Sequence, residues 1–198
     1  MSTTMKGAEV AKAMKETLIR EAEALKEKGI LPCLTIIRVG ARPDDLAYER
    51  GAKKRMELIG IECRVRELPE DISQREFEKE FQKINQDPSV HGILLFHPLP
   101  DHLDEKPVKS IIHPYKDVDC MSDVNIAKVF AGDETGFAPC TAEAVVRMLD
   151  HYGIDPKGRK VTVVGRSMVV GKPLAMLLLD RHGTVTLCHT HTADLEEE

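Results

Sequence analysis

The fold of this chain is decided by one stretch, Lys160-Val161-Thr162-Val163-Val164-Gly165-Arg166-Ser167-Met168-Val169-Val170-Gly171-Lys172-Pro173. After Lys160 its β-branched residues run without a charge as far as Gly165, which predicts a strand buried on both of its faces. Apolar residues at helical spacing then predict a helix that begins near Gly171 and runs to Arg181. The stretch therefore predicts a strand, a glycine turn and a helix in succession.

Such a turn can hold an anionic group, because the free N–H groups and the dipole of the following helix both point at it. The turn residues are Gly165, Arg166 and Ser167. Their spacing is not G-x-G-x-x-G, so it is a weak signal for a dinucleotide. On spacing alone, an ordinary turn between a strand and a helix is an equally good interpretation.

Strands and helices alternate along the rest of the chain. Strands are predicted at residues 34–37, 63–66, 92–96, 160–164 and 184–187, and helices at 5–28, 44–58, 73–84, 106–112, 124–130, 141–151 and 170–181. This alternation predicts an α/β fold with largely parallel sheets. Ligands of such folds bind beyond the carboxyl ends of strands, so site residues are expected at 39–48, 96–100 and 165–167.

Three of these helices have recognisable start signals. Ser73 followed three residues later by Glu76 predicts a capping box. Asp44 or Asp45 is expected to cap the helix that runs to residue 58, and Thr141 is expected to cap the helix that runs to residue 151.

Composition excludes several classes of protein. The 198 residues suffice for one large or two small domains, and 42% hydrophobic with 31% charged residues is ordinary for a globular protein. A net charge of −5 argues against nucleic acid or an anionic membrane as main partner, and no apolar run is long enough to span a bilayer. The five cysteines form no C-x-x-C pair, which favours reduced thiols in a cytoplasmic protein and predicts no metal site.

Six short motifs follow one another in order. They are Val39-Gly40 with Pro43 and Tyr48, Gly92-Ile93-Leu94, Pro98-Leu99-Pro100, Lys116-Asp117-Val118-Asp119, Pro139-Cys140-Thr141, and Gly165-Arg166-Ser167 with Val170-Gly171 and Pro173. In this order and spacing they resemble the bifunctional methylenetetrahydrofolate dehydrogenase/methenyltetrahydrofolate cyclohydrolase family. The resemblance covers the chain from Leu34 to its last residue.

The resemblance implies an N-terminal three-layer folate-binding lobe, residues 1–140, and a Rossmann-type NADP-binding lobe, residues 141–198. It also implies tetrahydrofolate derivatives as ligands, a role in cytoplasmic one-carbon metabolism and purine biosynthesis, and a homodimer. Substrate would be bound by Tyr48, by Pro98, Leu99 and Pro100, and by Asp119, whose carboxylate would hold the pterin ring. Without the resemblance, we would interpret Tyr48 as a core tyrosine and Asp119 as a helix cap or a solvated loop residue.

The cofactor residues suggested by the turn are Gly165, Arg166 and Ser167, with Thr190 after the last predicted strand. Enzymes that prefer NAD usually have an acidic residue at the end of the second strand, whereas the stretch 188–192 contains none. Arg166 can pair with a 2′-phosphate and Thr190 can donate to it. We therefore expect NADP rather than NAD.

Two positions depart from the family pattern. The family has Tyr-x-x-x-Lys on a helix and a Gln that supports this lysine, but here Ala52 and Phe96 take these places. Lys53 and Lys54 follow, but each helical residue turns by about 100°, so they point away from the Tyr48 face. Cyclohydrolase activity is therefore expected to be weak or absent, unless His97 or Lys53 replaces the lysine.

The expected activity is oxidation of 5,10-methylenetetrahydrofolate to the methenyl form, with Tyr48 and His97 as candidate catalytic residues. The alternative is a catalytically silent member that binds folate or nucleotide in a regulatory or scaffold role. After Gly158 the sequence offers one strand, one helix and one further strand, whereas a nucleotide lobe has two such halves. The NADP lobe is therefore expected to be incomplete at its C-terminal end and to bind its ligand less well than the folate lobe does.

Overall fold

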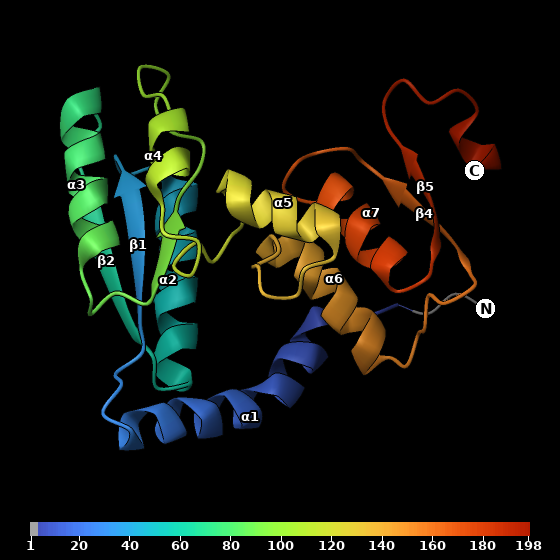
Figure 1. Cartoon of the computed structure of the whole chain (residues 1–198), viewed down its shortest axis with the longest axis horizontal. Coiled ribbons are helices and arrows are strands. Elements are labelled where there is room, and N and C mark those ends of the chain that lie inside the picture. Colours follow the sequence, from blue (N-terminus) through green and yellow to red (C-terminus); the bar gives the residue numbers. More distant parts are fainter. Residues whose placement is uncertain (1–3) are drawn as a thin grey trace. The chain divides into compact units, whose positions relative to one another are not determined.

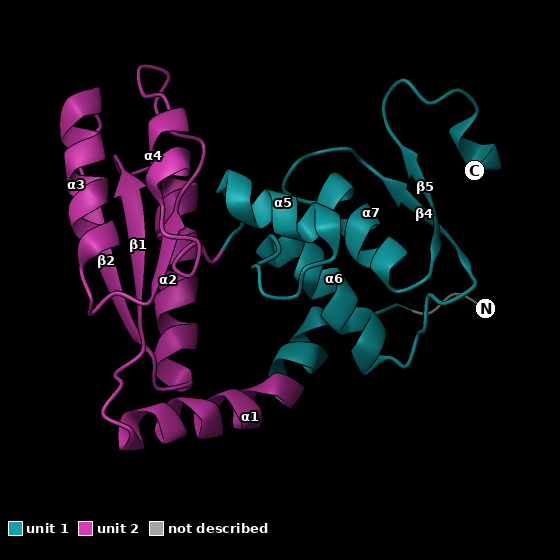
Figure 2. Cartoon of the chain, in the orientation of Figure 1, with its two compact units in different colours: residues 1–12, 119–198 teal, residues 13–118 magenta. Residues whose placement is uncertain are grey.

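A computed structural model describes residues 4–198 of the chain, which divide into two compact units (Figures 1 and 2). One unit holds residues 13–118, and the other combines residues 4–12 with residues 119–198. Helix α1 (Gly7–Glu27) contributes residues to both. Each unit is described separately below.

The unit of residues 13–118 is built on a parallel three-stranded sheet. Its elements beyond α1 are β1 (Cys33–Val39), α2 (Pro43–Leu58), β2 (Glu62–Leu68), α3 (Gln74–Gln86), β3 (Gly92–Leu95) and α4 (Lys106–Ile111). The strand order is β2-β1-β3, and Leu34 of the central strand pairs with Cys63 on one side and with Gly92 on the other. The predicted parallel arrangement is confirmed for this sheet.

The core of this unit includes both faces of β1 and one side of α3. Ile36 and Ile37 of β1 are fully buried, as are Phe77 and Phe81 of α3, whose ring centroids lie 6.4 Å apart. The helix begins with the predicted capping box, since the Ser73 side chain accepts a hydrogen bond from the Glu76 backbone and the Glu76 side chain bonds back. The sequence pattern and the packing therefore agree in α3.

Two other predicted caps are wrong. Helix α2 begins at Pro43, with Arg42 as its N-cap residue and without a side-chain cap, so Asp44 and Asp45 lie within the first turn. Proline suits this first position because its fixed φ is already helical and it has no N–H to leave unpaired. Helix α6 (Cys140–His151) likewise begins after Pro139, and Thr141 lies inside it.

The second unit contains a two-stranded parallel sheet, β4 (Lys160–Val164) paired with β5 (Thr184–Cys188). Its helices are α5 (Asp123–Ala131), α6, α7 (Gly171–Asp180) and the short 3₁₀ helix η1 (Leu195–Glu197). A small core joins Val163 of β4 to Val146 of α6 and to Leu174 and Leu178 of α7. The strand, turn and helix expected from the sequence are therefore present.

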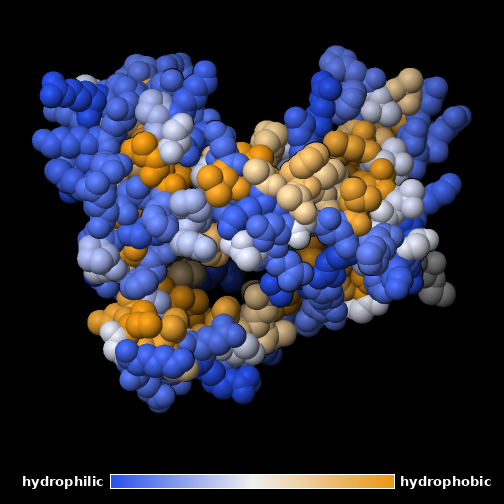
Figure 3. Space-filling view, in the orientation of Figure 1, coloured by the Kyte–Doolittle hydropathy of each residue, from blue (hydrophilic) through white to orange (hydrophobic). Residues whose placement is uncertain are grey.

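The expectation that β4 is buried on both faces is wrong. Only Val163 of this strand is buried, while the neighbouring Val164 is 68% exposed. The side chains of a strand alternate between its two faces, and only the face of Val163 packs against α6 and α7. Figure 3 shows further apolar surface over α5 and α7, where Phe130 is 76% exposed.

The first described residues are tied to the end of α6 within this second unit. The Tyr152 hydroxyl accepts a hydrogen bond from the Lys6 backbone at 2.9 Å and donates one to the Glu9 carboxylate at 3.0 Å. None of the helices described here is both long enough and apolar enough to cross a membrane.

We predict that Phe77→Ala lowers the free energy of unfolding by about 3–5 kcal/mol, because it removes a fully buried aromatic ring from the core. Denaturant unfolding followed by circular dichroism measures this loss. Phe130→Ala is the matched control and should cost less than about 1 kcal/mol, because that ring is mostly in solvent. Equal losses in the two variants would contradict the assignment of the core.

Candidate functional site

Tyr48 and Phe96 form an aromatic pair near the carboxyl end of the three-stranded sheet. Their ring centroids lie 5.3 Å apart and the ring planes are inclined by 72°, which is an edge-to-face contact. Phe96 directly follows β3, and its backbone N–H donates to the Ile37 carbonyl at 3.0 Å. Phe96 is buried while Tyr48 is 62% exposed, so Tyr48 is not a core tyrosine. Its ring is supported from one side and is open to solvent.

The position four residues after Tyr48 has no group that can carry a proton. Ala52 is half-buried on α2, and the next two side chains, Lys53 and Lys54, are both exposed. The helical rotation expected from the sequence accounts for this difference in exposure. The methyl group of Ala52 cannot donate or accept a proton, so acid–base chemistry beside Tyr48 must come from elsewhere.

His97 is the titratable group nearest in sequence to Phe96, and it is engaged with a carboxylate. Its Nδ1 atom lies 3.3 Å from Oε2 of Glu105, which also forms an ion pair with Lys109. A salt bridge to His97 requires a protonated imidazole. The neighbouring loop is tethered as well, because Arg42 donates to the Pro98 carbonyl at 3.2 Å. Leu99 and Pro100 are half-buried in this loop.

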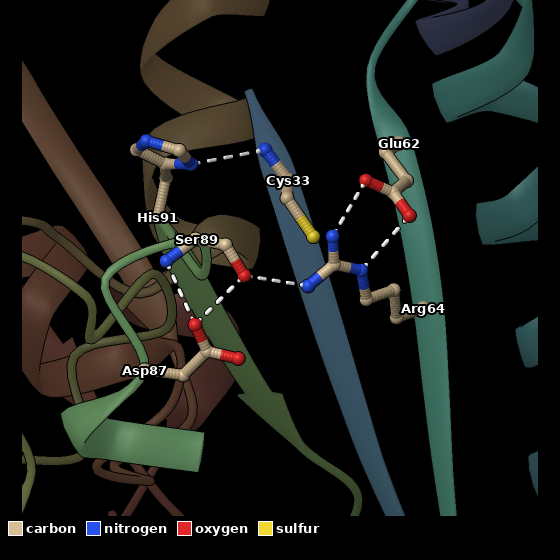
Figure 4. A network of polar contacts seen from close by, with 6 residues as sticks. All are labelled: Cys33, Glu62, Arg64, Asp87, Ser89 and His91. Carbon is tan, nitrogen blue, oxygen red and sulfur yellow. Dashed lines mark hydrogen bonds and ion pairs between the residues drawn. The ribbon is translucent and has the colours of Figure 1, made fainter. Parts of the chain in front are cut away.

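A polar network holds the opposite, amino-terminal edge of this sheet (Figure 4). Arg64 pairs with Glu62 at 2.8 Å and donates to the Ser89 hydroxyl at 2.8 Å, and the Cys33 backbone donates to the His91 ring at 3.3 Å. Burial raises the pKa of the Cys33 thiol, which makes it a poor nucleophile. The network lies at the starts of the strands, so we assign it a structural role.

In the second unit, Asp119 is fixed by the N-terminus of α6. Its Oδ1 atom accepts a hydrogen bond from the Cys140 backbone at 2.9 Å, and its side chain is half-buried. This hydrogen bond satisfies one of the N–H groups that a helix leaves unpaired at its start. Asp117, two residues earlier, is fully buried. Asp119 is therefore the carboxylate of this motif with an accessible edge.

The glycine turn is closed by backbone geometry that other residues cannot adopt. Gly165 has a φ of 127°, and its N–H donates to the Cys188 carbonyl at 2.8 Å. A Cβ atom on Gly171 would lie 1.8 Å from the Gly165 carbonyl oxygen, so no larger residue fits where α7 begins. The Ser167 hydroxyl accepts a hydrogen bond from the Val170 backbone at 3.1 Å. The turn is thus tightly built, while the Arg166 side chain is exposed.

The residues after β5 add imidazoles to this turn. Desolvation lowers the pKa of His189, and the nearby Arg166 and His191 lower it further. Its Nδ1 atom accepts a hydrogen bond from the His191 backbone at 3.1 Å, which fits a neutral ring. Thr190 is exposed, and residues 188–192 contain no acidic side chain. The pattern of the sequence pointed to Arg166 and Thr190, but it did not place His189 beside them.

Neither unit offers an obvious place for a metal ion. Among residues 4–198, no three His, Cys, Asp or Glu side chains are grouped so as to hold one.

Comparison with known proteins gives concordant results for both units. Residues 5–119 match the tetrahydrofolate dehydrogenase/cyclohydrolase catalytic domain, and residues 139–198 match the NAD(P)-binding domain of the same family. The bifunctional protein FolD of Clostridium kluyveri is 54% identical over 197 residues, which span the whole of this chain and 69% of that protein.

Solved structures of relatives have the same fold. The bifunctional FolD enzyme of Campylobacter jejuni superposes with a TM-score of 0.93 at 38% identity, covering 96% of this chain and 68% of that one. The Trypanosoma brucei methylenetetrahydrofolate dehydrogenase-cyclohydrolase, solved with NADP and an inhibitor, has a TM-score of 0.89 at 34% identity over 96% of this chain and 65% of its own. The chain belongs to the tetrahydrofolate dehydrogenase/cyclohydrolase family.

Proposed function

We propose that this protein is an NADP-dependent methylenetetrahydrofolate dehydrogenase with little or no cyclohydrolase activity. The proposal rests on one feature of α2. Tyr48 is exposed and its ring packs against Phe96, but Ala52 takes the position four residues later where the family has its lysine. A surface for the substrate ring is present, whereas the proton carrier beside it is absent. The two activities of the family therefore have different requirements here.

Hydride transfer requires little acid–base catalysis by the protein. A bound nicotinamide would supply the hydride acceptor, and the protein would bind and orient the two reactants. Tyr48 would stack on the folate and donate or accept a hydrogen bond through its hydroxyl, while Asp119 would bind the polar edge of the pterin. Arg166, with Thr190 beside His189, would bind the 2′-phosphate of NADP. None of these roles requires the lost lysine.

Hydrolysis of the methenyl bridge is more demanding. A water molecule must be activated and a ring nitrogen protonated, which calls for a positioned titratable group. Ala52 cannot supply it, Phe96 cannot support one, and Lys53 and Lys54 are exposed to solvent. His97 is the remaining candidate in the loop, but its Nδ1 atom faces Glu105. These features support the loss of cyclohydrolase activity.

The further parts of the proposal rest on the family. Residues 1–140 would carry the folate site and residues 141–198 the NADP site. The protein would act as a cytoplasmic homodimer in one-carbon metabolism and purine biosynthesis. The rival function, a silent binder of folate or nucleotide, is favoured by the same replacements of the lysine and the glutamine by Ala52 and Phe96.

We predict that NADP is bound more tightly than NAD, because Arg166 is exposed beside the imidazoles of His189 and His191 and no acidic residue follows β5. Arg166→Ala should weaken NADP binding by about 10- to 100-fold, the loss of a charge-assisted contact, and leave NAD binding nearly unchanged. Calorimetric titration measures both constants. Arg159→Ala, which removes an arginine exposed before β4, is the control. Equal affinity for the two cofactors, unaltered by Arg166→Ala, would refute this assignment.

We predict that methenyltetrahydrofolate decays almost as slowly with the protein as without it, as followed by its absorbance. The double variant Ala52→Lys, Phe96→Gln should accelerate the decay by about 10²–10⁴-fold, the usual worth of a positioned acid–base group. Ala52→Gln with Phe96→Gln is the matched control, since it adds bulk without a titratable amine. Fast decay with the unaltered chain would reject the proposal and turn attention to His97→Ala and Lys53→Ala.

A further inference from the structure

A buried arginine stands beside the helix that carries Tyr48. The side chain of Arg38, on β1, is only 3% exposed. Its Nε atom donates to Oε2 of Glu49 at 2.9 Å, its Nη2 atom lies 3.0 Å from Oε2 of Glu67, and its Nη1 atom donates to the Gly40 carbonyl. Burial alone lowers the pKa of this guanidinium, but the two carboxylates outweigh that effect and raise it. Arg38 is thus a permanent cation that joins three segments.

Helix α2 has few fully buried side chains to hold it in place. Asp45 is its only buried residue between Pro43 and Leu58. The apolar side chains on its inner side, Leu46, Ala52 and Met56, are only half-buried, so the apolar stripe that usually fixes a surface helix is incomplete here. Polar contacts therefore share the task of holding α2, and the Arg38–Glu49 pair is the most buried ion pair of this helix, with side chains 3% and 15% exposed.

Glu49 directly follows Tyr48 in the helix. Successive helical residues point about 100° apart, so two anchored neighbours fix the rotation of a helix about its axis. Glu49 is anchored to Arg38 and Tyr48 rests against Phe96. If the Glu49 anchor were lost, α2 would be free to rotate or shift, and the Tyr48 ring would leave its edge-to-face contact with Phe96.

We propose that Arg38 is a positioning residue for substrate binding, which acts through Glu49 to set the orientation of the Tyr48 ring. This inference rests on the proposed function, in which Tyr48 stacks on the folate. An apolar residue in place of Arg38 would leave Glu49 partly buried without its partner, which is unfavourable. A lysine would keep the charge but could not reach three acceptors with the fixed fork of a guanidinium.

The test compares tetrahydrofolate binding by calorimetry across variants of the full chain. Arg38→Met should weaken binding about tenfold, as expected for residues coupled within one network, and Arg38→Lys should recover part of the loss. NADP binding should be unchanged in both. Arg64→Met is the matched control, because it removes an arginine–glutamate pair at the amino-terminal edge of the same sheet, and it should leave both ligands unaffected.

A double-mutant cycle separates positioning from plain stability. In a Tyr48→Ala background, Arg38→Met should weaken tetrahydrofolate binding less than about twofold, because the ring it orients is already gone. If Arg38→Met costs the same in both backgrounds, the inference is overturned. If Tyr48→Ala alone leaves binding unchanged, the proposed function of Tyr48 fails instead.

A second variant, Glu49→Gln, keeps the inference testable if Arg38→Met does not fold. Glu49→Gln removes one charge, keeps the side-chain size and retains an acceptor for Arg38, and it should weaken tetrahydrofolate binding in the same direction. The same cycle with Tyr48→Ala applies to it. In turnover assays both Arg38→Met and Glu49→Gln should raise the KM for the folate substrate more than they lower kcat. A fall in kcat at constant KM in both variants would contradict a positioning role.

Discussion

The pairing of β1 with β2 and β3 is the constraint on which the first unit depends. All three strands run parallel, so their carboxyl ends meet at one edge and their following loops converge there. This brings Tyr48, which comes shortly after β1, to Phe96, which comes directly after β3. The opposite edge is closed by the polar network around Arg64. The candidate site residues thus occupy the edge of the sheet at which ligands of parallel α/β folds bind.

The ion pair between Arg38 and Glu49 explains how the polar helix α2 can hold the Tyr48 ring in a defined position. Helix α2 has one buried residue, yet Tyr48 keeps a defined contact with Phe96 because the neighbouring Glu49 is held by Arg38. Removing one partner of a buried ion pair costs more than the pair contributes when intact, since the remaining charge loses its compensation. Arg38 and Glu49 are therefore expected to tolerate change only together.

Much of this arrangement could be predicted from the sequence, because it follows from local patterns. The capping box of Ser73 and Glu76, the order of strands and helices, and the outward direction of Lys53 and Lys54 each depend on neighbours a few residues apart. The starts of α2 and α6 were misplaced because proline, rather than aspartate or threonine, determines where those helices begin. The burial of β4 was overestimated, since an apolar run does not reveal how many faces of a strand are covered.

The tertiary contacts of the site could not be predicted in the same way. Arg38 meets Glu49 and Glu67 only because α2 and β2 fold back beside β1, and no spacing rule connects these positions. The same holds for His189, which reaches Arg166 through the pairing of β4 with β5. In a sequence such residues look like ordinary charged positions on a strand or after one.

We propose that this protein transfers hydride but does not hydrolyse the methenyl product. The most direct test is to mix the protein with 5,10-methylenetetrahydrofolate and NADP and to measure reduced cofactor and both folate products over the first turnovers. If hydrolysis is absent, methenyltetrahydrofolate accumulates in equal amount to the reduced cofactor. Formation of formyltetrahydrofolate from the first turnover, without accumulation of the methenyl form, would contradict this proposal, as would the absence of any reduced cofactor.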